Sequence, residues 1–211
     1  MKYNNNRLCL DGVFFEDICS KYSTPTYIYS RDEILSNIGS YKINIDSGDL
    51  VCFSVKSSNN LHILKLISSE GLGFDVVSGG ELKKVLFINA DTNKIVFSGV
   101  GKTRQDLICA IKNNIKSINV ESLSELKLIS ALVKELNTSA NIALRLNPEI
   151  KSKTHPYLET GSSESKFGIA KSELIQCMNI IKNQKNINLK GLAFHIGSEI
   201  NDFSYFKRAI S

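Results

Sequence analysis

The stretch Leu50-Val51-Cys52-Phe53-Ser54-Val55-Lys56 points to the fold, because it is an apolar run of strand-forming residues that ends in a lysine. A second run, Gly73-Phe74-Asp75-Val76-Val77-Ser78-Gly79-Gly80, carries an aspartate and closes on two glycines. Short apolar runs bounded by turn residues are typical of strands buried on both faces in a parallel sheet. The two runs therefore predict buried strands that bring Lys56 and Asp75 to the same edge of a sheet.

Runs of this kind alternate with amphipathic stretches along most of the chain. Strands are expected at residues 50–55, 73–77, 94–98, 117–120, 141–146 and 189–195, and helices at 61–69, 80–87, 104–113, 123–136 and 171–182. Parallel strands need crossover connections, so this alternation predicts an α/β fold. Before it, we expect a short strand, a turn and a brief helix over residues 8–24, a strand at 26–29 and a helix at 31–41.

The spacing of the expected strand ends favours a (β/α)8 barrel of the TIM type over a doubly wound sheet. The first four intervals between strand ends are 21 to 26 residues, and no G-x-G-x-x-G follows the first strand. The last interval is longer because it holds a polar insertion, residues 149–166, with His155, Pro156 and Tyr157. A closed barrel needs eight strands. We therefore expect a partial barrel, truncated after about six.

The composition predicts a globular protein that binds neither nucleic acid nor a membrane. Its 211 residues are 42% hydrophobic, enough for a sizeable core. The net charge of +5 comes from lysines spread along the chain and not from a basic block. Five cysteines lack a C-x-x-C pair, and Cys52 and Cys109 lie in apolar patterns, so we expect buried free thiols. Without a signal-peptide core or a membrane-length apolar run, the expected location is cytoplasmic.

Polar residues at the expected strand ends are candidates for chemistry, because barrel active sites lie at that end of the sheet. They are Lys56, Asp75, Ser78, Glu81, Glu121, Arg145, His195 and Ser198. A desolvated Lys56 amine would suit condensation with a carbonyl group, whereas an ordinary lysine there reaches out to water. Asp75 would hold a cation or orient the amine, or form a simple ion pair. His195 would stack on a flat cofactor ring, or be a core histidine with its hydrogen bonds satisfied.

Two familiar patterns are incomplete in this sequence. The run Gly99-Val100-Gly101-Lys102-Thr103 lacks the first glycine of a phosphate-binding P-loop, since that position is Val96. Thr103 is expected to cap a helix instead. The three histidines have no i, i+4 pairing and no cysteine partner at zinc spacing, so no metal site is expected.

Eight stretches, in order along the chain, resemble the fold type III pyridoxal-phosphate decarboxylases. They are residues 53–59, 71–82, 98–103, 119–122, 144–148, 153–161, 166–169 and 195–198. Residues 74–82 and 154–161 resemble the diaminopimelate branch more than the branches that act on ornithine, lysine or arginine. The resemblance implies decarboxylation of meso-2,6-diaminopimelate to L-lysine and carbon dioxide, with pyridoxal 5'-phosphate as cofactor and a small amino acid as substrate.

The resemblance also implies roles for six residues. They are Lys56, Asp75, Glu81, Arg145, His195 and Ser198. Lys56 would be the Schiff-base lysine, His195 would stack on the pyridoxal ring, and Ser198 would contact the cofactor phosphate. The other three would line the cofactor side of the barrel. Ser57 and Ser58 depart from an alanine and an asparagine that are usual after the lysine; these positions flank the chemistry and would modulate it.

The same resemblance implies an organisation into two parts. Residues 1–29 would pack with a C-terminal β domain, residues 30–211 would form the partial cofactor-binding barrel, and the full-length form would be a homodimer. Because the family's glycine-rich phosphate loop and most substrate-binding residues lie in that second half, we expect these 211 residues alone to bind the cofactor poorly and to be inactive. The alternatives are a decarboxylase of the ornithine, lysine or arginine type, a non-catalytic fragment or regulator, and a small single-domain pyridoxal-phosphate barrel protein with a homeostatic role.

Overall fold

The computed structural model describes residues 1–148, 167–198, 200 and 202–210. It divides the chain into two compact units, Met1–Asp49 and Leu50–Ser211, and each is described by itself below. The insertion expected at residues 149–166 lies outside the described residues. The expected packing of residues 1–29 against a further domain stays a prediction.

The first unit combines a small antiparallel sheet with two helices. Its elements are β1 (Lys2–Asn4), β2 (Arg7–Leu10), β3 (Val13–Phe14), α1 (Phe15–Tyr22) and α2 (Arg31–Lys42). The Arg7 guanidinium lies 3.9 Å from the centre of the Phe14 ring and pairs with Glu16 and Asp17 of α1. These side chains connect β2 to α1, although solvent screens exposed ion pairs of this kind.

The predictions for this unit are partly right. The helix expected at residues 31–41 is confirmed as α2, and the Ser30 hydroxyl caps it by accepting the Glu33 N–H. The strand expected at residues 26–29 is wrong, because these residues lie in no strand. Tyr27 is 91% exposed, so its strand-forming side chain has no sheet face to pack on.

The second unit is built on a parallel sheet whose six strands follow one another in chain order. They are β4 (Cys52–Ser54), β5 (Gly73–Val76), β6 (Ile95–Phe97), β7 (Ser117–Val120), β8 (Ala140–Arg145) and β9 (Ile187–Ala193). A doubly wound sheet would reverse its strand order partway across, whereas a barrel wall keeps it. The strand order therefore confirms the predicted α/β barrel architecture, with six strands among the residues described.

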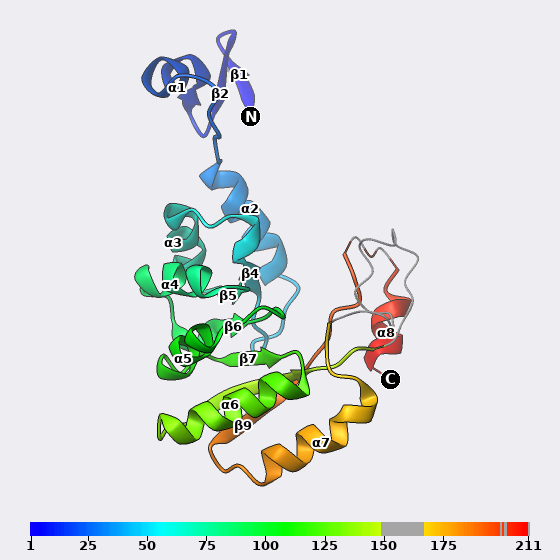
Figure 1. The fold of residues 1–211 in the computed structure, drawn as a ribbon. Helices are drawn as coiled ribbons and strands as arrows, with labels where there is room; N and C mark the ends of the chain where they lie inside the picture. The colour runs from blue at the N-terminus through cyan, green and yellow to red at the C-terminus, as the bar shows by residue number, and fades with distance from the viewer. Residues whose placement is uncertain (149–166, 199, 201, 211) are drawn as a thin grey trace. The chain divides into compact units, whose positions relative to one another are not determined.

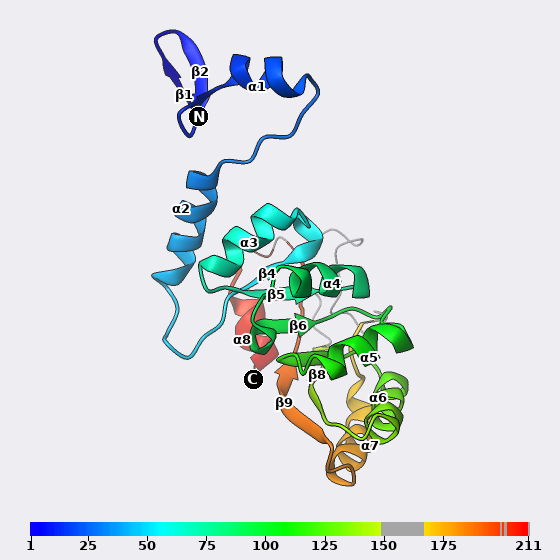
Figure 2. The same ribbon diagram turned by 90° about the vertical axis from the view of Figure 1, so that its left-hand side faces the viewer.

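Five helices cover one side of this sheet (Figures 1 and 2). They are α3 (Leu61–Ser69), α4 (Gly79–Phe87), α5 (Arg104–Lys112), α6 (Leu123–Glu135) and α7 (Lys171–Lys182). The predicted helices agree with them to within one residue at each end. The core lies between helices and sheet, where Phe74, Phe97, Leu82 and Leu126 are fully buried. The short helix α8 (Ser204–Ile210) was not predicted.

Three of the helices begin with a hydroxyl followed three residues later by an acid. The pairs are Ser78 and Glu81, Thr103 and Asp106, and Ser122 and Glu125. In each pair the hydroxyl accepts the N–H of the acid residue, as the predicted cap at Thr103 requires. Such caps are worth about 1 kcal/mol each and fix the turn between a strand and the next helix.

Gly73 shows how closely neighbouring segments approach at the start of β5. A Cβ atom placed there would lie 2.3 Å from the Lys94 carbonyl oxygen, closer than non-bonded atoms can come. Only glycine fits this position without a backbone shift.

The cysteines differ from the sequence prediction in burial but not in chemical state. All five cysteines are free thiols, as predicted, but Cys52 and Cys109 are half-buried and not buried. Cys52 is less covered than expected because β4 is an edge strand of the sheet.

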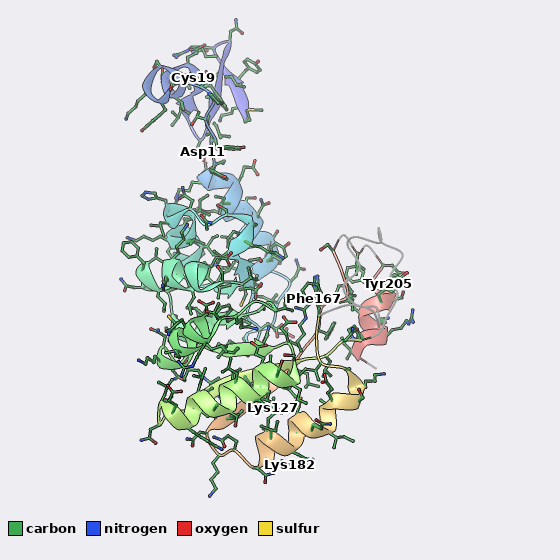
Figure 3. The ribbon with its side chains drawn as sticks, in the orientation of Figure 1. Asp11, Cys19, Lys127, Phe167, Lys182 and Tyr205 are labelled. Atoms are coloured by element: carbon green, nitrogen blue, oxygen red, sulfur yellow. The ribbon has the colours of Figure 1, made fainter. Side chains whose placement is uncertain are left out.

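The exposed Lys127 and Lys182 lie on different helices, α6 and α7 (Figure 3). No helix in the described part of the chain is long and apolar enough to cross a membrane.

Candidate functional site

Lys56 lies just beyond β4, in a single 3-10 turn, η1 (Val55–Ser57). The predicted strand extended through Val55, but β4 ends at Ser54 because the Ser57 hydroxyl donates to the Ser54 carbonyl at 2.7 Å and closes the turn. Val55 is fully buried and anchors the turn, while Lys56 is exposed. The amine therefore stands at the carboxyl end of the sheet, on a backbone that is fixed on both sides.

Asp75, in β5, lies in a row of polar side chains that crosses four strands. The Ser98 hydroxyl donates to Asp75 Oδ1 at 2.6 Å, and the Asn119 amide donates to Ser98 Oγ at 3.1 Å. On the other side, the Ser54 hydroxyl is 3.5 Å from Asp75 Oδ2. Because side chains alternate along a strand, this row faces away from the buried Phe74 and the helices. It lies on the face that would be the barrel interior.

Arg145, the last residue of β8, forms a buried ion pair with Glu121. Its Nη1 atom lies 2.7 Å from Glu121 Oε1, and the two side chains are 12% and 2% exposed. The same carboxylate oxygen accepts the Gly99 N–H at 3.0 Å, and the Arg145 guanidinium lies 5.2 Å from the centre of the Phe167 ring, which Figure 3 labels. Arg145 is therefore a paired charge, as a largely buried guanidinium has to be.

A second buried cation, Lys102, joins the loops that follow β6 and β7. Its side chain is 1% exposed, and its ammonium lies 2.8 Å from Glu125 Oε1, 2.6 Å from the Gly99 carbonyl and 2.8 Å from the Asn119 carbonyl. The two carbonyl contacts are hydrogen bonds, and the contact with Glu125 is an ion pair. Lys102 therefore braces the rim and is not placed as a phosphate ligand, in agreement with the incomplete P-loop pattern.

His195 lies two residues beyond β9, which ends at Ala193 and not at residue 195 as predicted. Partial desolvation of the ring by the rim around it lowers the pKa of His195, and the charges of Arg145 and Lys56 lower it further. The charges of Asp75 and Glu121 act in the opposite direction. All four charged groups therefore act on the imidazole electrostatically, and the shared cofactor site expected for Lys56, Asp75, Arg145 and His195 stays a prediction.

The side chains of Glu81 and Ser78 form hydrogen bonds with the backbone at the start of α4. Glu81 Oε2 accepts the Val77 N–H at 2.9 Å, and Ser78 caps the helix. Ser198 is exposed and follows Gly197, whose φ of 140° lies in the region that favours glycine. The cofactor roles expected for Glu81 and Ser198 stay predictions.

Sequence reasoning missed Ser98, Asn119 and Lys102 as members of this rim. One signal was available for Asn119. In residues 117–120, polar Ser117 and Asn119 alternate with apolar side chains, which places both on one face of β7. Nothing comparable marks Ser98, which simply ends an apolar run.

The donor set suits a flat aldehyde cofactor. Lys56 offers a primary amine to a carbonyl carbon, His195 offers an aromatic face, and Asp75 Oδ2 has only the long Ser54 contact among the described residues. No cluster of three or more histidine, cysteine or acidic side chains that would hold a metal ion occurs in the part of the chain that the structure describes.

Comparisons with known proteins place this chain in a family. Residues 31–211 match the sequence pattern of the pyridoxal-dependent decarboxylases, specifically their pyridoxal-binding domain. The chain is 38% identical over 209 residues to diaminopimelate decarboxylase of Pseudomonas aeruginosa, covering 99% of this chain and 50% of the relative.

Solved structures agree with the sequence match. Diaminopimelate decarboxylase of Helicobacter pylori, complexed with L-lysine, superimposes with a TM-score of 0.87 at 36% identity, over 92% of this chain and 50% of that one. The enzyme from M. jannaschii, in co-complex with L-lysine, gives 0.86 at 35% identity, over 97% and 49%. The chain thus spans about half the length of the relatives it matches. It belongs to the fold type III pyridoxal-dependent decarboxylases, and the relatives it resembles are diaminopimelate decarboxylases.

Proposed function

We propose that this chain supplies the cofactor-binding barrel of a decarboxylase that converts meso-2,6-diaminopimelate to L-lysine and carbon dioxide. The observation that carries the proposal is that Lys56, Asp75 and His195 stand at or near the carboxyl ends of β4, β5 and β9 in one parallel sheet, with the charges of Lys56 and Asp75 both acting on His195. The similarity to diaminopimelate decarboxylases over nearly the whole chain favours this substrate over ornithine, lysine or arginine.

Each residue of the rim has a distinct task in this proposal. Lys56 would hold pyridoxal phosphate through its amine, which its exposed position leaves accessible to both the cofactor and the substrate. His195 would stack on the cofactor ring and, with a lowered pKa, is neutral at physiological pH. Asp75 and Arg145 line the cofactor side, and Ser198 contacts its phosphate. Glu81, which the resemblance also assigns to the cofactor side, accepts the Val77 N–H at the start of α4, and its role is tested separately. The bound cofactor supplies the electron sink for the carbanion that remains when carbon dioxide leaves.

The ion pair beneath the rim has a supporting task. Glu121 holds Arg145 at 2.7 Å and the Gly99 backbone at 3.0 Å, so that the loops after β6, β7 and β8 share one anchor. A rim held this way keeps reacting groups in fixed positions, which is the main contribution that a protein makes to cofactor chemistry.

Selective labelling of Lys56 tests the cofactor site. The chain is incubated with pyridoxal phosphate, reduced with borohydride, digested and analysed by mass spectrometry. We expect the label mainly on the peptide that carries Lys56, and its loss in Lys56→Arg. A matched control, Lys127→Arg, removes an exposed lysine of α6 and should change nothing at Lys56. Labels scattered evenly over surface lysines would contradict the assignment and favour a non-catalytic fragment.

Release of carbon dioxide from carboxyl-labelled amino acids tests the reaction. We expect no turnover by the 211-residue chain alone, because β4 and β9 each pair on one side only among the described strands and the sheet is not closed. Addition of the C-terminal half of a similar decarboxylase should restore release from diaminopimelate in preference to ornithine, lysine and arginine. Turnover by the chain alone, or a preference for another of these substrates, would refute the corresponding part of the proposal. The homodimer expected for the full-length form is tested on the same mixture by light scattering.

A further inference from the structure

We infer that Ser98 and Asn119 are positioning residues that hold the Asp75 carboxylate in one orientation toward Lys56 and His195. The importance of that orientation for catalysis rests on the proposed function. The positioning itself rests on hydrogen bonds that no role suggested by the sequence accounts for.

The backbone places the three side chains side by side. Asp75 is paired in register with Val96 across β5 and β6, and the Ser98 N–H donates to the Val76 carbonyl at 2.8 Å. Ser98, the first residue after β6, is therefore still hydrogen-bonded to the last residue of β5. Asn119, from β7, completes the row on the same face of the sheet.

The direction of hydrogen bonding along this row is fixed by chemistry. The Asn119 amide nitrogen can only donate, so Ser98 Oγ accepts from it at 3.1 Å. The single hydroxyl hydrogen of Ser98 is then free to point at Asp75 Oδ1, 2.6 Å away, a length typical of a hydrogen bond to an ionised acceptor. The Ser117 hydroxyl, 3.4 Å from Asn119 Oδ1, favours the same orientation of the amide.

This arrangement gives the two oxygens of Asp75 different tasks. Oδ1 is held by Ser98, whereas Oδ2 has only the 3.5 Å contact from Ser54 in the described part of the chain. The carboxylate is thus fixed through one oxygen and presents the other to the rim. Without Ser98 it would rotate among alternative side-chain conformations and weaken its influence on the groups opposite.

The alternative is that these hydrogen bonds only satisfy half-buried polar groups. Removing the Ser98 hydroxyl would then reduce stability but leave the electrostatic effect of Asp75 on His195 unchanged. The two cases separate in a double-mutant cycle that is read at His195 and needs neither cofactor nor turnover.

The experiment measures the imidazole pKa of His195 by NMR in four proteins: wild type, Asp75→Asn, Ser98→Ala and the double variant. Because the charge of Asp75 raises the pKa of His195, Asp75→Asn should lower it. We expect this decrease to be clearly smaller in the Ser98→Ala background. Equal decreases in the two backgrounds would overturn the inference.

Further variants keep the test decisive. Ser98→Thr retains the hydroxyl and should retain the full decrease. Asn119→Ala, like Ser98→Ala, should make the decrease in the His195 pKa caused by Asp75→Asn smaller. If Ser98→Ala does not fold, Asn119→Ala takes its place in the cycle. Ser69→Ala, whose hydroxyl donates to the Leu66 carbonyl within α3, is the control and should have no effect. A chain that takes up no pyridoxal phosphate even after the C-terminal half of a similar decarboxylase is added, yet shows the coupling, would refute the proposed function and leave the positioning role intact.

Discussion

Glu121→Gln tests whether the buried ion pair with Arg145 holds the rim together. The side chains of Glu121 and Arg145 are only 2% and 12% exposed, so solvent does not compensate the charge that remains after the substitution. Breaking a buried pair by neutralising one partner typically costs about 3–5 kcal/mol. Glutamine can still accept the Gly99 N–H, so the loss reports mainly on the ion pair. With a urea m-value of about 1–3 kcal/mol/M, the unfolding midpoint should fall by roughly 1 M or more.

The assay is urea unfolding followed by circular dichroism, with an exposed ion pair as matched control. Arg104 and Glu135 also form an ion pair, but their side chains are 47% and 55% exposed, so Glu135→Gln should cost less than about 1 kcal/mol. Arg145→Gln should destabilise about as much as Glu121→Gln, and the double variant should lose less than the sum of the two. If Glu121→Gln costs no more than Glu135→Gln, the argument that this pair anchors the rim is wrong.

Three further outcomes are expected. The pKa of His195 in the folded chain, measured by NMR, should lie below its usual value of 6.5. Since the unfolded chain then binds the proton more readily, the contribution of His195 to stability is present above pH 6.5 and declines as the pH falls through 6.5 toward the folded pKa. His195→Gln should remove this pH dependence of stability. Burial and the Asp75 charge raise the pKa of the Cys52 thiol to about 11, so iodoacetamide should label it more slowly in the folded than in the urea-unfolded protein at pH 8, and equal rates would contradict this. Gly73→Ala should destabilise the chain by about 1–3 kcal/mol in the same unfolding assay, because its Cβ would meet the Lys94 carbonyl at 2.3 Å, whereas Gly101→Ala, with open space around it, should not.

The helices could be predicted because their signals are local. α3 and α7 match their predicted bounds, and the Thr103 cap lies within the segment that it caps. The predictions failed where a distant partner decides the structure. Residues 26–29 have strand-forming side chains but no neighbouring strand. The end of β4 is a different, local failure, because the Ser57 hydroxyl closes a turn onto the Ser54 carbonyl before Val55 can extend the strand.

The candidate site shows the same division. Its location followed from the fact that parallel strands end at one edge, so Lys56, Asp75 and His195 could be assigned to one rim. The hydrogen bond between Ser98 and Asp75 joins residues 23 positions apart and depends on the register of β5 and β6, which no local pattern reveals.

The acids of the rim divide into two kinds according to where they stand on the chain. Asp75 lies within a strand and Glu121 directly follows one, and both affect the rim groups through their charge. Glu81, Asp106 and Glu125 stand three residues after a capping hydroxyl, and each accepts a backbone N–H at the start of a helix. An acid three residues after the capping hydroxyl serves the start of its helix whether or not the protein binds a cofactor.

The resemblance and the geometry suggest different roles for Glu81, cofactor binding and capping of α4, and a single variant distinguishes them. Glu81→Gln keeps an acceptor for the Val77 N–H while removing the charge, so a residue that only caps α4 would leave both stability and labelling of Lys56 by pyridoxal phosphate unchanged. The hydrogen bond at 2.9 Å leads us to expect that result. A folded Glu81→Gln protein with reduced labelling at Lys56 would instead assign the Glu81 charge to the cofactor, as the resemblance implies, and the distinction between the two kinds of acid would not hold for this residue.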